Sequence, residues 1–262
     1  MFIVVALLTA GCQATDRPRL GFPTPITQEG LRTLSLWQGS WVAAILVGLV
    51  VWALIIWASI FHRKRTEELP PQVRYNVPIE VLYTVLPFVI IAVLFFFTAR
   101  DESILVDTSR KPDQTVNVVG KKWTWDFNYL DQGVYDTGTP AAPPTLWLVQ
   151  GQRVEFILTS PDVIHSFWVP AFLFKMDVIP GRQNKFQVVP TTVGEFTGRC
   201  AEFCGVDHAR MLLTVKVVTQ QEFQAHIEDL RRRGQTLQGS TPQGLGPEAP
   251  ALAQSSSGSG RT

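Results

Sequence analysis

The chain has few of the side chains that bind transition metals, and it carries almost no net charge. Its 262 residues include three cysteines, four histidines and three methionines, and the formal net charge is +1. So small a charge gives no basic surface of the kind that binds nucleic acid, and no nucleic-acid partner is predicted. The sequence also lacks a Cys-x-x-Cys-His motif, so no c-type haem is predicted in this chain.

Charge is nearly absent from two long apolar runs in the first half of the chain. Residues 36–61 contain no formal charge, and residues 78–98 contain only Glu80, near their start. About 20 apolar residues cross a bilayer as a helix, and the interior Pro87 is tolerated in such a helix. The sequence therefore predicts a transmembrane helical hairpin over residues 36–98. Its Lys- and Arg-rich connection favours a cytoplasmic loop, with both chain ends outside.

The first twelve residues, MFIVVALLTAGC, resemble the end of a bacterial lipoprotein signal. In that interpretation residues 1–12 are a partial signal, and a lipidated Cys12 tethers the chain outside the membrane. No basic segment precedes the apolar run, and Thr9 stands where such signals usually carry Leu. An unmodified cysteine in a disordered end is therefore the alternative.

Beyond Arg100 the sequence changes to short runs of β-branched and aromatic residues, separated by Gly, Pro and Asp. This texture predicts an antiparallel sandwich or barrel over residues 100–218. A Thr followed three positions later by Glu, at the start of residues 219–233, predicts a capped C-terminal helix there. Residues 234–262 are rich in Gly, Ser, Pro and Gln and are predicted to be disordered.

Two of the three cysteines lie in one short stretch, GRCAEFCGVDHARM, at residues 198–211. Cys200, Cys204, His208 and Met211 are spaced so that one loop could bring two thiolates, an imidazole and a thioether to one point. Zinc sites rarely use a thioether, whereas cupredoxin copper sites combine His and Cys with a weak axial Met. The stretch therefore favours copper.

A copper site of this kind needs a second histidine from another strand, and His165 is the candidate. His62 falls in the predicted cytoplasmic loop and His226 in the predicted terminal helix, so neither belongs to the β-rich region. A mononuclear site uses one thiolate, so two thiolates suggest a dinuclear site bridged by both sulfurs. The alternative for the cysteines alone is a Cys200–Cys204 disulfide in an oxidising compartment.

The runs HSFWVPAFLFKMDVIPGR and GRCAEFCGVDHARM, following two apolar spans, resemble subunit II of haem–copper cytochrome c oxidases over roughly residues 37–230. The resemblance implies a membrane-anchored all-β protein, in which a two-helix hairpin precedes a cupredoxin-like Greek-key β-barrel with a dinuclear CuA centre of two copper ions. It implies that both sulfurs bridge the coppers and that the Glu202 backbone carbonyl joins the ligands. The implied ligand set is His165, Cys200, Glu202, Cys204, His208 and Met211.

The resemblance assigns roles to three further side chains. The Glu202 carboxylate corresponds to a ligand of Mg²⁺ or Mn²⁺ at the interface with subunit I, with Asp177 near that region. Trp123 matches the residue through which the electron enters, and Glu80 matches the mouth of a proton pathway. From the residues alone, Glu202 is more simply a solvated loop carboxylate, and Glu80 is more simply a carboxylate at a helix N-terminus. An alternating aromatic such as Trp125 is more simply a core residue.

The implied function is electron transfer from cytochrome c, through CuA, to the haem of subunit I, where O₂ is reduced to water and protons are pumped. This chain would itself bind no haem. The expected partners are cytochrome c, subunits I and III and the lipid bilayer. The expected location is a bacterial cell membrane, with the CuA domain and both termini on the extracytoplasmic side. Four acids lie in segments that flank Trp123 and His165 and predict a docking rim for a basic donor around the point where the electron enters: Asp126, Asp131, Asp136 and Asp162.

Three other protein classes share part of this pattern. Nitrous oxide reductase also has a CuA cupredoxin domain, but the hairpin with Glu80 and Glu202 argues against it. Subunit II of quinol oxidases has the same fold without copper and would lack Cys200 and Cys204. A membrane-tethered copper carrier would hold exchangeable copper and form no stable complex with haem-bearing partners.

Overall fold

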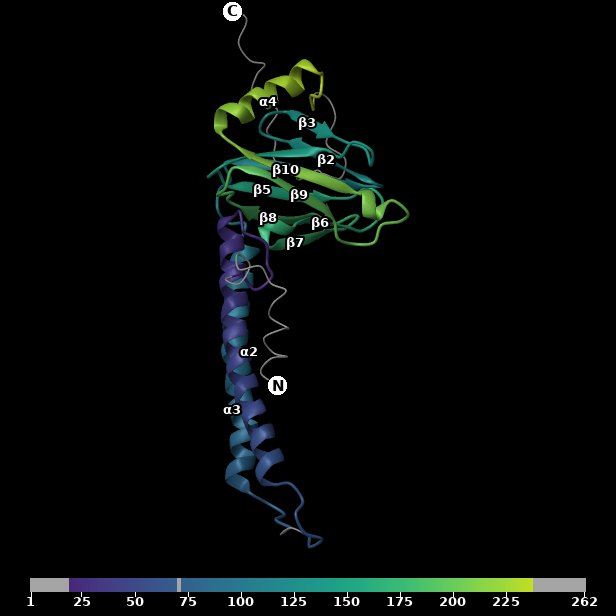
Figure 1. Ribbon diagram of the computed structural model, residues 1–262. Helices are drawn as coiled ribbons and strands as arrows, with labels where there is room; N and C mark the ends of the chain where they lie inside the picture. The colour runs from purple at the N-terminus through teal and green to yellow at the C-terminus, as the bar shows by residue number, and fades with distance from the viewer. Residues whose placement is uncertain (1–18, 70–71, 238–262) are drawn as a thin grey trace, which may run out of the picture. The chain divides into compact units, whose positions relative to one another are not determined.

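The computed structural model describes residues 19–69 and 72–237 (Figure 1). Cys12 and most of the predicted tail lie outside these residues. The chain divides into two compact units, one of residues 34–103 and one that combines residues 1–33 with 104–262. The first contains the apolar helices and the second contains all of the strands.

Two helices, α2 (Gln28–Phe61) and α3 (Val77–Leu105), are long and apolar enough to cross a membrane. Both helices extend past the apolar runs that predicted them, because helical hydrogen bonding continues into the polar flanks. Trp37 contacts Trp41 near one end of the apolar run of α2, and Trp57 packs on His62 at the other. From Trp41 to Trp57 the helix rises about 24 Å. Such a spacing suits aromatic belts at two membrane surfaces.

The strands form two five-stranded sheets. One has the order β3-β2-β1-β5-β8 and the other β4-β10-β9-β6-β7. The two sheets confirm the predicted cupredoxin-like architecture. The prediction of antiparallel pairing is wrong at two places, because β1 pairs with β5, and β4 with β10, in parallel.

The strands of the first sheet are β1 (Gln114–Lys121), β2 (Thr124–Tyr129), β3 (Val134–Thr137), β5 (Val154–Thr159) and β8 (Asn184–Val188). Those of the second are β4 (Thr145–Val149), β6 (His165–Val169), β7 (Phe174–Val178), β9 (Gly194–Cys200) and β10 (Leu212–Val218).

Aromatic rings fill the core of the strand-bearing unit. Trp125, Phe127 and Tyr129 alternate along β2 and are completely buried. Phe156 and Phe186 from the first sheet meet Phe167 from the second, with ring centroids 5.0 to 6.3 Å apart. Each fully buried Phe contributes about 2–3 kcal/mol relative to exposure. The loops at the ends of these strands therefore start from a rigid base.

The C-terminal helix α4 (Gln220–Arg232) begins at a capping box. The Thr219 side chain accepts from the Glu222 backbone N–H, and the Glu222 carboxylate accepts from the Thr219 backbone N–H. The buried apolar face of the helix consists of Phe223, Ile227 and Leu230.

The prediction that disorder begins at residue 234 is wrong for residues 234–237. The Tyr135 N–H donates to the Gln235 carbonyl at 3.1 Å, and the Leu237 N–H donates to the Gly133 carbonyl at 2.9 Å. This segment pairs with β3, which otherwise has a free edge. Backbone pairing to an open strand edge needs no apolar side chains, so composition gave no sign of it.

Three loops meet at one end of the sandwich. The β1–β2 turn follows Lys121, which pairs with Thr124, while β6 begins and β9 ends at that same end. The Lys122 N–H donates to Asp162 in the β5–β6 loop, and the Trp123 indole donates to the Cys204 carbonyl in the β9–β10 loop. This end of the unit carries the candidate site.

Candidate metal centre

The β9–β10 loop begins and ends at neighbouring positions on adjacent strands. Cys200 is the last residue of β9 and pairs with Phe167 of the neighbouring strand β6. Met211 directly precedes β10, and its carbonyl accepts from the Cys200 N–H at 2.9 Å. Between them, the loop carries Cys204 and a short 3₁₀ turn that starts at His208. The loop therefore returns to its starting point, with its ligand side chains turned toward one place.

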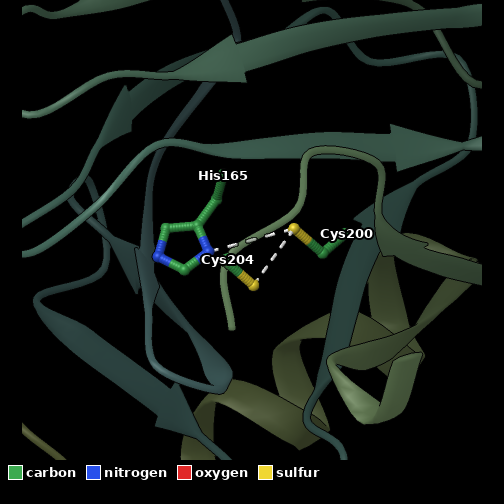
Figure 2. A group of neighbouring side chains, drawn as sticks. All are labelled: His165, Cys200 and Cys204. Carbon is green, nitrogen blue, oxygen red and sulfur yellow. Dashed lines mark hydrogen bonds between the residues drawn. The ribbon is translucent and has the colours of Figure 1, made fainter. Parts of the chain in front are cut away.

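The two thiol sulfurs face each other without a bond between them. Cys200 Sγ lies 3.9 Å from Cys204 Sγ, and Figure 2 shows both sulfurs and the His165 ring pointing into a common space. A disulfide would need about 2.05 Å, so that alternative is not adopted. Metal–thiolate bonds of about 2.3 Å allow one ion to contact two sulfurs up to about 4.6 Å apart. The pair thus has the separation of bridging ligands.

Each sulfur is flanked by one imidazole and one further donor. His165 Nδ1 lies 3.9 Å from Cys200 Sγ, and the Glu202 carbonyl lies 3.2 Å from the same sulfur. His208 Nδ1 lies 3.5 Å from Cys204 Sγ, and the Met211 sulfur lies 3.8 Å from it. The other four ligand groups of the predicted set therefore surround the two cysteine sulfurs. Their role as copper ligands remains a prediction.

The centre is closed to water on most sides. His165 and Met211 are completely buried, and the cysteines are only 4% and 6% exposed. His208 is half-buried, while the side chain of Glu202 points to solvent. A metal here would be screened from water, with His208 on its more open side.

Ionisation of the two thiols is unequal. Burial opposes the thiolate at Cys200, but hydrogen bonds with His165 and backbone groups lower its pKa to about 7. Burial and the adjacent Cys200 charge raise the pKa of Cys204 to about 12. Near neutral pH Cys204 therefore stays protonated while Cys200 is partly ionised, and a metal cation would displace the remaining protons. Metal binding should release protons and strengthen as pH rises.

The donor set fits copper. Two thiolates, two imidazoles, a thioether and a carbonyl exceed the four donors of a zinc site, and the thioether is a soft ligand that suits copper. Within residues 19–69 and 72–237, the cluster of His, Cys and acidic ligands with metal-binding geometry consists of His165, Cys200 and Cys204. The carboxylates of Glu202 and Asp177 join no such cluster among these described residues.

The family model described as cytochrome c oxidase subunit II, periplasmic domain, matches residues 144–218. A probable cytochrome c oxidase subunit 2 from Streptomyces avermitilis is 53% identical over 93% of this chain and 88% of its own length. The chain belongs to the cytochrome c oxidase subunit II family. It is thus a subunit of an oxidase, and its two apolar helices anchor an extracytoplasmic domain.

Two further proteins that are similar to this chain share less of its sequence. Cytochrome c oxidase subunit 2 of Mycobacterium tuberculosis is 33% identical over 87% of this chain and 79% of its own length. The crystal structure of the periplasmic domain of the cytochrome oxidase subunit II from Bradyrhizobium japonicum is 31% identical. It covers 47% of this chain and 97% of the other, with a TM-score of 0.44.

In this subunit II chain, Trp123 contacts the ligand loop directly. Its indole Nε1 donates to the Cys204 carbonyl at 3.1 Å. The ring also lies against Gly205, where a Cβ would come within 3.1 Å of it, and Gly205 has φ +125°. Only glycine suits both that conformation and that approach. Trp125, in contrast, is buried core, with its ring centroid 6.2 Å from that of His165.

The four acids predicted to dock the donor lie in different surroundings, and their docking role stays a prediction. Asp126 is paired with Lys121 at 2.6 Å. β2 runs away from Trp123, so Asp131, which follows its end, lies about 17 Å or more from that turn. Asp131 accepts from the Thr115 N–H, Asp136 is partly buried with its pKa raised by that burial, and Asp162 contacts His165. The closeness of these acids to Trp123 in the sequence does not reveal that β2 runs away from Trp123. It also does not reveal which backbone N–H groups donate to their carboxylates.

Sequence reasoning missed Gly120, which makes room for the His165 ring. A Cβ there would lie 3.3 Å from His165 and 3.1 Å from the Trp125 ring. The signal in the sequence was a glycine within a run of strand-forming residues, which often marks close approach by another group. Glu80 lies at the start of α3, where its carboxylate accepts from the Asn76 N–H at 3.0 Å.

Proposed function

We propose that this chain binds two copper ions between Cys200 and Cys204 and is the electron-accepting subunit of its oxidase. It would take electrons from cytochrome c and pass them to the haem of subunit I, where O₂ is reduced to water and protons are pumped. The observation that carries the proposal is the pair of buried sulfurs 3.9 Å apart, each with an imidazole Nδ1 beside it. Membership of the family supports the same assignment.

The chain's own contribution is a fixed and dry set of ligands. When bound, the copper pair would supply a one-electron redox couple. The hydrogen bond between the Cys200 N–H and the Met211 carbonyl closes the loop, and burial of His165 excludes water. A site that moves little when its charge changes needs little reorganisation during electron transfer. Trp123 would be the point where the electron enters, because it is hydrogen-bonded to a ligand residue.

The remaining assignments follow from family membership. We infer that Glu80, at the end of a membrane helix, opens a proton pathway into subunit I, since ionisable residues at the membrane edge are commonly functional. The exposed Glu202 carboxylate would hold Mg²⁺ or Mn²⁺ together with ligands from subunit I. We also propose that subunit III and the lipid bilayer are partners of this chain, and that both of its termini lie on the extracytoplasmic side. Cys12 would be lipidated.

Electron paramagnetic resonance of the copper-loaded full-length chain tests the dinuclear centre. Copper nuclei have a spin of three halves, so one electron shared by two equivalent coppers gives seven hyperfine lines. A mononuclear centre gives four lines and would refute the proposal. Copper analysis of the same sample should give two ions per chain.

A further inference from the structure

Asp162 lies behind His165, and its two carboxylate oxygens contact different elements. Oδ1 is 2.9 Å from His165 Nε2, while Oδ2 accepts from the Lys122 N–H at 2.8 Å. One side chain thus connects the first residue of β6 with the β1–β2 turn, which carries Trp123.

The contact with Asp162 decides which nitrogen of His165 carries the proton. An ionised carboxylate can only accept hydrogen bonds, so Nε2 must be the donor. The lone pair of the neutral ring then lies on Nδ1, which faces Cys200 Sγ at 3.9 Å. Because His165 is completely buried, water cannot take the place of the carboxylate. The ring is therefore held in the form that binds a metal through Nδ1.

The second imidazole has no comparable support in the described residues. Nδ1 of His208 faces Cys204, and the ring of Phe203 lies at 5.8 Å. Within residues 19–69 and 72–237, no carboxylate contacts the other ring nitrogen of His208. The two histidines are therefore unequal, one anchored from within this chain and one more open.

Two simpler roles for Asp162 explain only part of its contacts. As a turn residue it accepts from the Val163 N–H at 2.6 Å, but a local turn does not account for Lys122, 40 positions away. As a docking acid it would need free acceptor capacity at the surface, whereas its side chain is only 26% exposed and both oxygens are hydrogen-bonded.

We propose that Asp162 is a positioning residue, which sets the orientation and tautomer of His165 and connects the metal centre to the turn that carries Trp123. The inference rests on the proposed copper function and adds a residue outside the ligand set. Carboxylates that support a ligating histidine in this way fix its orientation and tautomer, and replacing them typically weakens metal binding.

The test uses the full-length chain in detergent, titrated with copper alone. Asp162→Ala removes both acceptors and should lower copper affinity about 10- to 100-fold, the usual loss for such partners. It should also change the reduction potential and the copper spectrum. Asp162→Asn keeps one acceptor oxygen and should recover most of the affinity. Asp131→Asn is the matched control, because Asp131 also accepts from a backbone N–H but lies at the far end of β2.

Thermal unfolding without copper shows whether each variant is folded, and Asp162→Asn carries the test if Asp162→Ala does not fold. In that case the Asn variant should still shift the potential relative to Asp131→Asn. Wild-type affinity, potential and spectrum in both Asp162 variants would overturn the inference, and a loss confined to the rate with cytochrome c would overturn it in favour of docking. If the wild-type chain itself binds no copper, the proposed function fails and the inference fails with it.

Discussion

At the scale of single residues, the sulfur atoms of the site are not interchangeable. Cys200→Ser and Cys204→Ser should each abolish oxidation of cytochrome c, because a serine oxygen is a hard and poorly ionised ligand for copper. Met211→Leu should retain much of the copper and shift its potential, since an axial thioether is a weak ligand. Copper content and potentiometry of the purified oxidase measure both effects. Full copper content and activity in either serine variant would contradict the bridging role.

Gly120 provides a second test at this scale, through steric contact alone. In Gly120→Ala the new methyl would lie 3.1 Å from Trp125 and 3.3 Å from His165, both of which are completely buried. Neither ring can move into open space, so we expect a loss of about 1–3 kcal/mol in stability. Copper affinity should fall as well.

Thermal unfolding and copper titration of the full-length chain measure these two losses. Gly39→Ala is the control, because its methyl meets nothing within 4 Å. Equal behaviour of the two variants would show that the His165 ring has more room than the structure indicates.

At the scale of elements, α4 is attached to the sandwich through an uncharged histidine. His226 stacks on Trp147 with ring centroids 4.3 Å apart, and its Nε2 is buried without a hydrogen-bond partner. Burial, helped by the charge of Arg233, lowers the pKa of His226 to about 4 from 6.5. The neutral form is therefore the one that packs.

A histidine whose pKa is lowered by folding stabilises the protein above its unfolded pKa and less so as pH falls. Between pH 6.5 and 4, protonation of the unfolded chain at His226 should cost up to about 3 kcal/mol. Thermal unfolding across this range should show a steeper decline for the wild type than for His226→Phe, which keeps an aromatic ring but cannot titrate. Parallel curves would mean that other groups cause the acid sensitivity.

How much the sequence could predict depends on the kind of signal. The apolar runs, the Thr219–Glu222 box and the Cys-His-Met spacing are local patterns, and each predicted its element or loop. Parallel pairing of β1 with β5 depends on how strands cross between sheets, which no local pattern encodes. The contact of Asp162 with His165 was missed for a related reason, since three residues' separation says nothing of which way a loop side chain turns.

At the scale of the whole molecule, the near-neutral charge bears on how the donor is recruited. Beside Trp123, Asp126 is paired with Lys121 and Asp162 is occupied by His165 and Lys122. The double variant Lys121→Gln, Asp126→Asn removes this ion pair without changing the net charge, so it should leave the salt dependence of the reaction with cytochrome c nearly unchanged. Stopped-flow rates over a range of ionic strength measure this. A marked flattening of the salt dependence would restore Asp126 as a docking residue.

Trp123→Phe should have a different signature. It removes the hydrogen bond to the Cys204 carbonyl, worth about 1 kcal/mol, and changes the contact with the ligand loop, while the charge of the surface stays the same. We expect slower electron transfer at saturating donor and an unaltered KM. The two parameters come from steady-state and single-turnover kinetics of the intact oxidase. A higher KM at an unchanged maximal rate would make Trp123 a binding contact instead.

The pairing of residues 235–237 with β3 has a consequence for self-association. A sheet whose outermost strand is bare offers a row of unpaired N–H and C=O groups to any other chain, and proteins commonly block such rows. Here the chain blocks the row at β3 with its own segment after α4. Residues 235–237 thus protect this strand edge from pairing with the strand edges of neighbouring copies on a crowded membrane surface.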